Sequence, residues 1–292
     1  MANKRLFLVG LFAAVIAGAA GGIFFLRYIQ RAEKALPSAQ EPAAITPTPT
    51  ASPTATPTPR PLTFAEMNER FGPCTTTPTL MYHHIEPLDV AKAANHLYLT
   101  VSPETFAAQM AFLAAKNYQP VTMTQLVAFF DQGQPLPPKS VLLTFDDGYA
   151  DFHQYAYPVL QQYQFHATMF LPTGLITNPD YLNWDQISQM NGSGLVMFAN
   201  HTWSHKSTSA GTEIARKEIG TADTQLSEHG LAQTKVFASP NGSPTSIVAS
   251  ILAELNYKLA FLTTPGRVLC AKQRFGLPRV RIGDTPLSRY GF

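Results

Sequence analysis

Charges of the two signs are nearly balanced in this sequence, and charged residues are few. The formal net charge is +2 at pH 7, and charged side chains make up 14% of the 292 residues. Proteins that bind nucleic acids usually present a strongly basic surface, so we expect no nucleic-acid partner. The same balance gives no sign of strong electrostatic steering of a charged ligand.

Cysteine is also scarce. Cys74 and Cys270 are the only two, and their wide spacing matches no zinc knuckle or redox motif. They are either two unrelated buried thiols or one disulfide, and a disulfide would require an oxidising compartment.

Only one long hydrophobic run occurs, and it lies near the N-terminus. It extends from Leu6 to Leu26, between Lys4–Arg5 and Arg27. About 20 apolar residues span a bilayer as a helix, whereas the apolar part of a signal peptide is usually about 7–15 residues long. We therefore predict that residues 1–36 form a transmembrane anchor. If a peptidase cuts within the small residues at 17–22, the protein is secreted instead.

A segment rich in Pro and Thr follows, at residues 37–63, and it includes the near-repeat TPTPTASPTATPTP. Such a tract cannot bury a core and stays extended, at about 3 Å per residue. We predict a disordered linker that holds the domain away from a membrane, with a plain spacer as the alternative. The remaining residues, 64–292, suffice for one α/β domain with a full core.

Short apolar runs recur through this domain, and we expect each to form a strand: 79–85, 141–145, 167–171, 195–199, 236–239, 259–262 and 280–282. Continuous rather than alternating apolar runs indicate strands that are covered on both faces. Helical segments lie between most of them, with helix starts at Ser102–Pro103 and at Ser243–Pro244. Alternation of strand and helix predicts an irregular (β/α)7-type barrel, whose chemistry would gather at the C-terminal ends of the strands.

Two adjacent carboxylates follow one of these strands. Asp146 and Asp147 end the run 141–145, and Gly148 permits a turn there. At such a bend both carboxylates can face one pocket, where one holds a metal and the other stays off the metal as a base. A solvated Asp-Gly turn is the alternative.

Histidines lie at the ends of two other predicted strands. His201 and His205 come directly after the run 195–199, and this spacing allows both to reach one ion, although such pairs also occur by chance on helices. Two histidines and one carboxylate would leave metal positions open for water and substrate. His83, in Met81-Tyr-His-His-Ile85, can be an acid, a ligand or a packed polar residue.

Taken together, these motifs resemble the polysaccharide deacetylases (the NodB-homology carbohydrate esterases). The segments TFDDG, ending at Gly148, and NHTWSH, ending at His205, resemble two motifs of that family. Segments that begin at Met81, Ser102 and Leu277 resemble the branch that includes the poly-N-acetylglucosamine deacetylases of biofilms. The resemblance covers roughly residues 79–282, and the motifs occur in the family's order.

The resemblance implies a metal site made of Asp147, His201 and His205. The implied cofactor is a divalent metal, with Zn2+ as the default and Co, Ni or Fe as alternatives. The implied reaction is metal-dependent hydrolysis of N-acetyl groups from an N-acetylglucosamine polysaccharide, which releases acetate. The chain would then be a hydrolase that acts on amide C–N bonds.

The resemblance also implies roles for residues beside the metal. Asp146 would be the general base, with Arg279 close to it. The tail from Leu277 lacks the family's usual Leu-x-His, so His83 is expected to be the general acid, with His84 as the weaker candidate.

A second departure affects the substrate-binding residues. Where the family usually has Pro-Tyr-Gly, this chain has Pro240-Asn-Gly242, so the backbone N–H of Asn241 is the expected oxyanion donor. Tyr149 and Trp184 are candidates for stacking against sugar rings, with core packing as the alternative.

The predicted barrel bears on the two cysteines. Cys74 precedes the first strand and Cys270 the last, and these strands are neighbours in a closed barrel, so we expect a disulfide between them. We expect a membrane-anchored, extracytoplasmic protein at the cell surface or in the periplasm. Two other functions stay open: deacetylation of peptidoglycan or chitin oligomers, and, in a chain with damaged catalytic residues, glycan binding without catalysis.

Overall fold

The short apolar runs of the sequence assemble into a closed parallel barrel. The computed structural model describes residues 60–231, 234–242 and 245–292. Within these ranges the barrel strands pair in the order β2-β6-β7-β8-β9-β10-β12, and β12 closes the circle by pairing with β2. The strands are β2 (Thr79–Tyr82), β6 (Ser140–Phe145), β7 (Ala167–Leu171), β8 (Val196–Asn200), β9 (Val236–Ala238), β10 (Leu259–Pro265) and β12 (Leu277–Arg281).

Each predicted run contains or overlaps one barrel strand, and the predicted (β/α)7-type barrel is confirmed. The reason is visible in the burial: every residue of β6 and of β7 is buried, as expected for strands covered on both faces. The barrel is also irregular, because β8 and β9 pair only at Asn200 and Phe237, and the register between β10 and β12 shifts.

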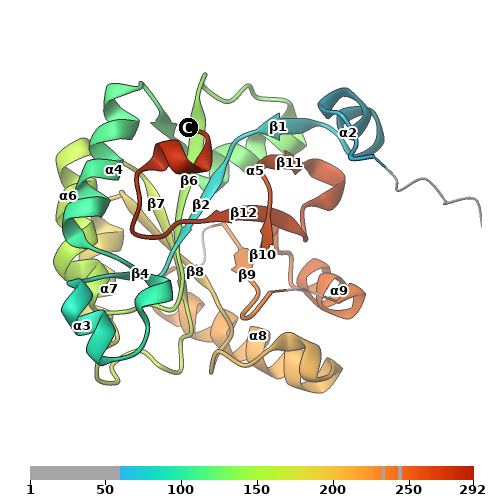
Figure 1. The fold of residues 1–292 in the computed structure, drawn as a ribbon. Helices are drawn as coiled ribbons and strands as arrows, with labels where there is room; N and C mark the ends of the chain where they lie inside the picture. Colours follow the sequence, from blue (N-terminus) through green and yellow to red (C-terminus); the bar gives the residue numbers. More distant parts are fainter. Residues whose placement is uncertain (1–59, 232–233, 243–244) are drawn as a thin grey trace, which may run out of the picture. The chain divides into compact units, whose positions relative to one another are not determined.

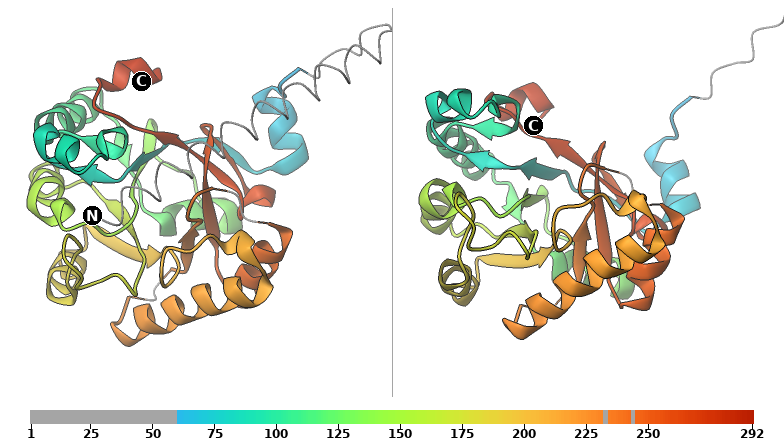
Figure 2. Two further views of the ribbon diagram at one scale, coloured as in Figure 1. Left: turned by 60° about the horizontal axis from the view of Figure 1, so that its bottom comes forward. Right: turned by 90° about the horizontal axis from the view of Figure 1, so that it is seen from below.

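Helices surround the strands on the outside (Figure 1). They are α2 (Phe64–Phe71), α3 (Leu88–Ala93), α4 (Pro103–Ala115), α5 (Met123–Gln132), α6 (Tyr157–Tyr163), α7 (Trp184–Gly192), α8 (Thr212–Glu228) and α9 (Ser246–Glu254). The group α3, α4, α6 and α7 covers one flank, while α8 and α9 cover another, and Figure 2 shows the same arrangement from two further sides. A short π-helix, η3 (Phe152–Ala156), leads into α6.

Helix starts can be compared with the sequence at one of the two predicted positions. Helix α4 begins at Pro103, and the Ser102 hydroxyl accepts a hydrogen bond from the backbone N–H of Thr105, as expected. The second predicted start, at Ser243–Pro244, lies outside the described residues. Helix α9 begins at Ser246, where the side chain of Thr245 caps it by accepting from the N–H of Val248.

A covalent clasp joins the segments that lead into β2 and β12. Cys74 and Cys270 form a disulfide, which confirms the predicted pairing. They are directly opposite each other in an antiparallel pair of short strands, β1 (Cys74–Thr76) and β11 (Val268–Cys270). Two further short strands, β3 (His84–Ile85) and β4 (Thr100–Val101), pair beside the barrel, and β5 (Gln119–Pro120) adds to the edge of β6.

The N-terminal predictions concern residues that are largely not described. The predicted anchor at 1–36 and the linker up to residue 59 lie outside the described ranges. Those ranges contain no helix with the length and apolar character needed to cross a bilayer. The described compact unit starts at Arg60, slightly before the predicted boundary at 64, and Thr63 caps α2.

Candidate active site

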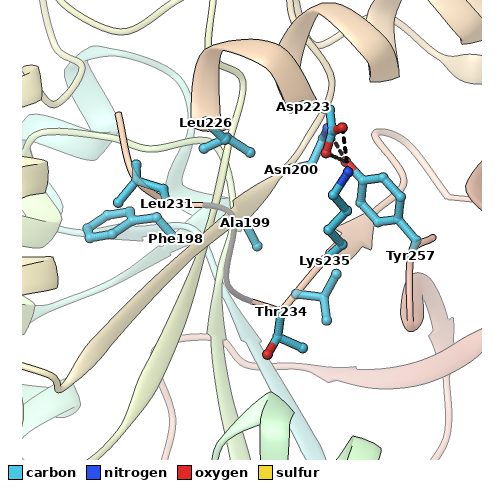
Figure 3. Close-up of a pocket in the computed structure, with 10 residues that line it drawn as sticks. Phe198, Ala199, Asn200, Asp223, Leu226, Leu231, Thr234, Lys235 and Tyr257 are labelled. Carbon is cyan, nitrogen blue, oxygen red and sulfur yellow. Dashed lines mark hydrogen bonds and ion pairs between the residues drawn. The ribbon is translucent and has the colours of Figure 1, made fainter. Parts of the chain in front are cut away.

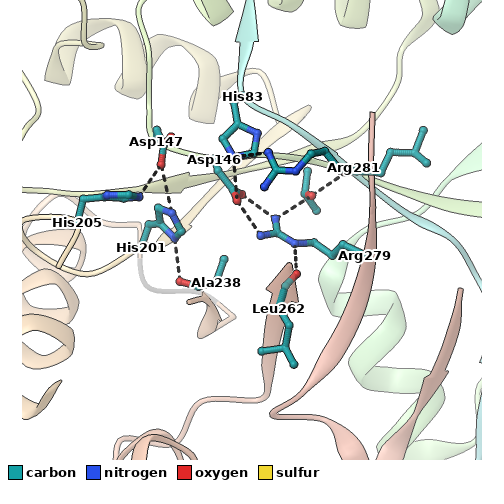
Figure 4. Close-up of polar contacts among 11 residues, drawn as sticks. His83, Asp146, Asp147, His201, His205, Ala238, Leu262, Arg279 and Arg281 are labelled. Atoms are coloured by element: carbon teal, nitrogen blue, oxygen red, sulfur yellow. Dashed lines mark hydrogen bonds and ion pairs between the residues drawn. The ribbon is translucent and has the colours of Figure 1, made fainter. Parts of the chain in front are cut away.

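Polar side chains from several strands meet at the carboxyl-terminal mouth of the barrel (Figure 4). They line a cavity of about 250 Å³. Residues that directly follow β2, β6, β8 and β9 line this cavity: His83, Asp146, Asp147, His201 and Ser239. The expected position of the chemistry, at the C-terminal ends of parallel strands, is therefore the position of this cavity.

The structure brings together the three residues expected to bind metal. The Nε2 atoms of His201 and His205 lie 3.2 Å and 3.0 Å from the Oδ1 atom of Asp147. Although these distances are short, Oδ1 is buried and has no hydrogen bond of adequate geometry. One carboxylate oxygen and two imidazole nitrogens that converge without satisfying one another fit a divalent cation.

His201 is held in the form that a metal ligand requires. Its Nδ1 atom lies 2.8 Å from the carbonyl oxygen of Ala238, and only an Nδ1–H can donate to a carbonyl. The proton on Nδ1 leaves Nε2 with a free lone pair that faces Asp147. Burial alone would raise the pKa of Asp147, but if both imidazoles instead carry a proton on Nε2, their donation holds that pKa well below its usual range.

A hydrogen-bond network outside the barrel fixes the end of β8, where His201 follows (Figure 3). The side-chain amide of Asn200 donates to the Tyr257 hydroxyl at 2.6 Å, and its oxygen accepts from the N–H of Thr202 at 2.8 Å. The Tyr257 hydroxyl in turn donates to Asp223. These bonds lock the backbone on both sides of His201, which fixes the direction of its imidazole.

A buried glutamate orders the loop between the two histidines. Glu218, on α8, accepts from the backbone N–H of Ser204 and from its hydroxyl, each at 2.7 Å. Glu218 is almost completely buried. His205, which directly follows Ser204, has a φ of +58°. The loop therefore holds a non-glycine residue in the left-handed region.

The other carboxylate, Asp146, is held by an arginine. Arg279 donates to both carboxylate oxygens of Asp146, from NH1 and NH2, at 2.7 Å each. Its Nε also donates to the carbonyl of Leu262, so the guanidinium, which has no exposed surface, is fixed in place. Burial would raise the pKa of Asp146, but the charge of Arg279 outweighs it and lowers that pKa.

His83 and its sequence neighbour point to different places. The Nε2 atom of His83 lies 4.0 Å from Oδ2 of Asp146 and 3.5 Å from NH1 of Arg281. Burial lowers the pKa of His83 to about 4, despite the nearby aspartates, so this histidine is neutral at pH 7. His84 instead contacts Asp151, outside the cavity. Of the two acid candidates, only His83 lines the cavity.

The remaining predicted site residues divide into two groups. Tyr149 and Asn241 line the cavity, and Asn241 adopts a φ of +59° in the turn after β9. Trp184 does not line the cavity, contrary to its candidacy for sugar stacking: its ring packs on that of His229 at a centroid distance of 3.7 Å. The indole ring of Trp184 is thus packed against His229 and does not face the cavity.

Among the residues that the sequence predictions did not name, two contact predicted site residues or their loop. Arg281 lines the cavity and reaches His83, and Glu218 holds the histidine loop. The sequence carried a signal for Arg281, because residues two apart in a strand face the same side and Arg279 was already a candidate. No comparable signal marked Glu218, which reaches the histidine loop from α8, 14 residues after Ser204.

Comparison with known proteins agrees with this site. Residues 133–260 match the family model described as polysaccharide deacetylase. This part of the chain is therefore similar in sequence to the polysaccharide deacetylase family. The match spans Asp146, Asp147, His201 and His205, so the aspartates and histidines of the predicted motifs lie in the part that the family model covers. The match agrees with the predicted enzyme class, a hydrolase of the polysaccharide deacetylase type.

Named relatives of this chain occur in bacteria. The poly-beta-1,6-N-acetyl-D-glucosamine N-deacetylase of Escherichia coli (strain K12) is 26% identical over 251 residues, with 71% of this chain and 36% of that protein covered. The chain therefore spans only about a third of the length of the Escherichia coli relatives that it matches.

Solved structures share the architecture of this chain's barrel. The Streptococcus pyogenes deacetylase PplD, in complex with acetate, has a TM-score of 0.65 and 29% identity, and the match covers 70% of this chain and 92% of PplD. IcaB from Ammonifex degensii has a TM-score of 0.64 and 25% identity, with 73% and 93% covered. The similarity thus extends over most of both solved domains.

Proposed function

We propose that this chain is a metal-dependent N-deacetylase that hydrolyses acetamide groups of an N-acetylglucosamine polysaccharide and releases acetate. One observation carries the proposal: two adjacent carboxylates have different partners. Asp147 lies against the imidazoles of His201 and His205, whereas Asp146 accepts hydrogen bonds from Arg279 and contacts neither imidazole. One carboxylate is thereby suited to hold a cation and the other to act as a base.

Asp147, His201 and His205 would hold the cation, and zinc is the metal that we expect first. Two nitrogen donors and one oxygen donor also suit cobalt, nickel or iron, so the ligand set alone does not select the metal. When bound, such a cation supplies Lewis acidity, which polarises an amide carbonyl and lowers the pKa of water.

Asp146 is the proposed base that takes a proton from the attacking water. Arg279 is a positioning residue in this scheme, because it touches Asp146 and does not line the cavity. By lowering the pKa of Asp146, Arg279 keeps the carboxylate ionised and ready at neutral pH. The bidentate contact also fixes the direction in which the base points.

His83 is the proposed acid, and its position suggests how it gains its proton. Because burial keeps it neutral, His83 cannot begin the reaction as the proton donor. Its Nε2 atom faces Oδ2 of Asp146 at 4.0 Å. The proton that Asp146 takes from water can pass to His83 and then to the leaving nitrogen, as the C–N bond breaks to give acetate and a free amine.

The other cavity residues would bind the substrate. The backbone N–H of Asn241, in the turn after β9, is the proposed donor to the oxygen that becomes negatively charged. Tyr149 offers an aromatic side chain at the cavity wall, where a sugar ring could pack against it.

The substrate class rests on the named relatives. The Escherichia coli relative is named for poly-β-1,6-N-acetyl-D-glucosamine, and we propose a polymer of this type for the present chain. Peptidoglycan or chitin oligomers are the alternative, since the same chemistry acts on any N-acetylglucosamine. A binding domain without catalysis is less well supported, because the acid, base and metal residues are all present in one cavity.

We also propose that the protein acts outside the cytoplasm, anchored to a membrane by residues 1–36. The disulfide between Cys74 and Cys270 supports an oxidising compartment. If the N-terminal segment is cleaved, the same domain would act as a secreted enzyme.

Acetate release tests the proposal. The full-length chain, stripped of metal and supplied with zinc, would be given β-1,6- and β-1,4-linked N-acetylglucosamine oligomers. We expect zinc-dependent release from the β-1,6 oligomers. Release only from β-1,4 oligomers would redirect the proposal to peptidoglycan or chitin, and no release from either by a folded, metal-loaded protein would contradict it.

A further inference from the structure

A second group of histidines and carboxylates lies outside the catalytic cavity. We call it the outer cluster, and it consists of His84, Glu86, His96 and Asp151. Successive residues of an extended chain point to opposite sides, so His83 enters the catalytic cavity while His84 enters the outer cluster. None of the four residues lines the catalytic cavity.

The donor atoms of the outer cluster converge closely. The Nδ1 atom of His84 lies 2.6 Å from Oδ2 of Asp151 and 3.7 Å from Oε1 of Glu86. The same Oε1 atom of Glu86 contacts Nε2 of His96. One ligand atom from each of His84, Glu86 and His96 lies within 4.8 Å of the others.

The outer cluster lacks the fixed positive charge that the catalytic cavity has. Glu86 is only 7% exposed, and the side chain of Asp151 is 13% exposed. In the described part of the chain, neither carboxylate forms an ion pair with a lysine or arginine; histidines are their only ion-pair partners. A buried and a half-buried carboxylate side by side are costly without compensating charge, and a divalent cation supplies it.

An open path reaches these donors. The outer cluster lines a cavity of about 480 Å³, separate from the catalytic one. His96 lies at the accessible side, with 24% of its side chain exposed. A metal site needs such an entry path as well as converging ligands.

We propose that the outer cluster is a second divalent-cation site, with His84, Glu86 and His96 as ligands and Asp151 as a fourth. Two imidazoles and two carboxylates are a donor set that zinc accepts in tetrahedral sites, with metal–ligand distances of about 2.0–2.2 Å. The close contacts of the outer cluster mean that small displacements of side chains would open room for the ion. This inference does not depend on the proposed function of the catalytic cavity.

Tyr149 links the two sites physically. Its side chain lines both cavities, and its ring stacks on the imidazole of His84 at a centroid distance of 3.6 Å. An ion bound to His84 would therefore also fix the tyrosine that follows Asp146, Asp147 and Gly148. The outer site would support the wall of the catalytic cavity without touching the reacting atoms.

Zinc stoichiometry tests the proposal on the full-length chain. After removal of metal, dialysis against micromolar zinc and elemental analysis should give about two zinc ions per chain. The double variant His201→Gln/His205→Gln, which lacks the catalytic ligands, should keep about one ion. Adding His96→Gln to that background should remove it, whereas adding His166→Gln, a half-buried histidine outside both clusters, should not.

Retention of one zinc ion after His96→Gln is added, or no zinc in the double variant, would overturn the proposal. A second readout leaves the outer cluster intact, in case the triple variant fails to fold. Cobalt added to the double variant should give the visible absorption of a tetrahedral site and saturate near one equivalent. No such absorption at saturating cobalt would overturn the proposal as well. Neither measurement uses acetate release, so failure here is distinct from failure of the deacetylase proposal.

Discussion

The mouth of the barrel and the disulfide clasp are built on opposite physical principles. The mouth gathers buried charges, an oxygen without a hydrogen bond, and non-glycine residues with positive φ such as Asp147 and His205. Each of these features costs stability. The clasp between β1 and β11 contains regular backbone pairing and one disulfide.

The difference separates reactivity from stability within one domain. The clasp closes a loop with a sequence separation of 196 residues and fixes the entries of β2 and β12, from which His83 and Arg279 project at the mouth. Damage at the mouth should therefore remove activity more than stability, and damage at the clasp should do the reverse.

The largest effect is expected for His83→Gln at the mouth. Loss of the proton donor should reduce acetate release by about 10²–10⁴-fold, because this is the usual contribution of a positioned acid or base. Steady-state acetate release measures the loss, and thermal unfolding checks that the fold survives. His166→Gln is the control, and an equal loss in the control would mean that the effect is not specific to the mouth.

The clasp should give the next largest effect, on stability rather than activity. Replacing both cysteines, as Cys74→Ala/Cys270→Ala, should lower the free energy of unfolding by up to about 5 kcal/mol, because a long loop is no longer closed in the unfolded chain. Urea unfolding measures this change. Activity per folded molecule should stay close to that of the native chain. A large loss of that activity would show that the two regions are not separable.

Arg279 lies on β12, the strand that leads from the disulfide clasp to the mouth. Replacing it tests whether a residue between the two regions acts on activity or on stability. Asp146 must be ionised to act as a base, and activity is lost as pH falls through its pKa. Arg279 lowers that pKa, so Arg279→Met should raise it and move the acidic limb of the pH profile to higher pH. The profile of acetate release against pH measures the shift.

Arg279→Lys is the matched variant for this prediction. It keeps the positive charge but loses the two-pronged contact, so its acidic limb should lie between those of the native chain and Arg279→Met. A rate that falls in both variants with no movement of the limb would mean that Arg279 only supports the fold.

The smallest effect is expected at Trp184. Because this ring packs on His229 and not in the cavity, Trp184→Phe should change KM for the oligomer by less than about twofold. Tyr149→Leu, at the cavity wall, should raise KM by more. Equal increases in both variants would place Trp184 on the path of the substrate after all.

The barrel was predictable because its signal is local and repeated. Each strand is a short continuous apolar run, and such runs need no knowledge of distant residues to be recognised. The site residues in motifs were predictable for the same reason: Asp146, Asp147, His201 and His205 follow strands directly. The start of α9 was less predictable because Thr245 and Ser243 are both suitable caps, and sequence alone did not distinguish them.

Other features depend on contacts between distant segments and left no local pattern. From sequence alone, the ring of Trp184 could line a substrate groove or pack against another part of the protein. Only the tertiary structure decides between the two. The outer cluster draws ligands from positions 84, 86, 96 and 151, which form no motif in the sequence. Likewise, the choice between His83 and His84 depends on which face of the segment meets Asp146, and this follows from the barrel rather than from the residues themselves.

The division of roles between Asp146 and Asp147 is the central claim, and zinc content measured beside acetate release tests it most directly. Asp146→Asn should bind as much zinc as the native chain while acetate release falls by about 10²-fold or more, because the base is lost and the ligands remain. Asp147→Asn should lose one zinc ion per chain together with the activity. Full zinc binding and activity in Asp147→Asn, or loss of zinc in a folded Asp146→Asn, would contradict the account.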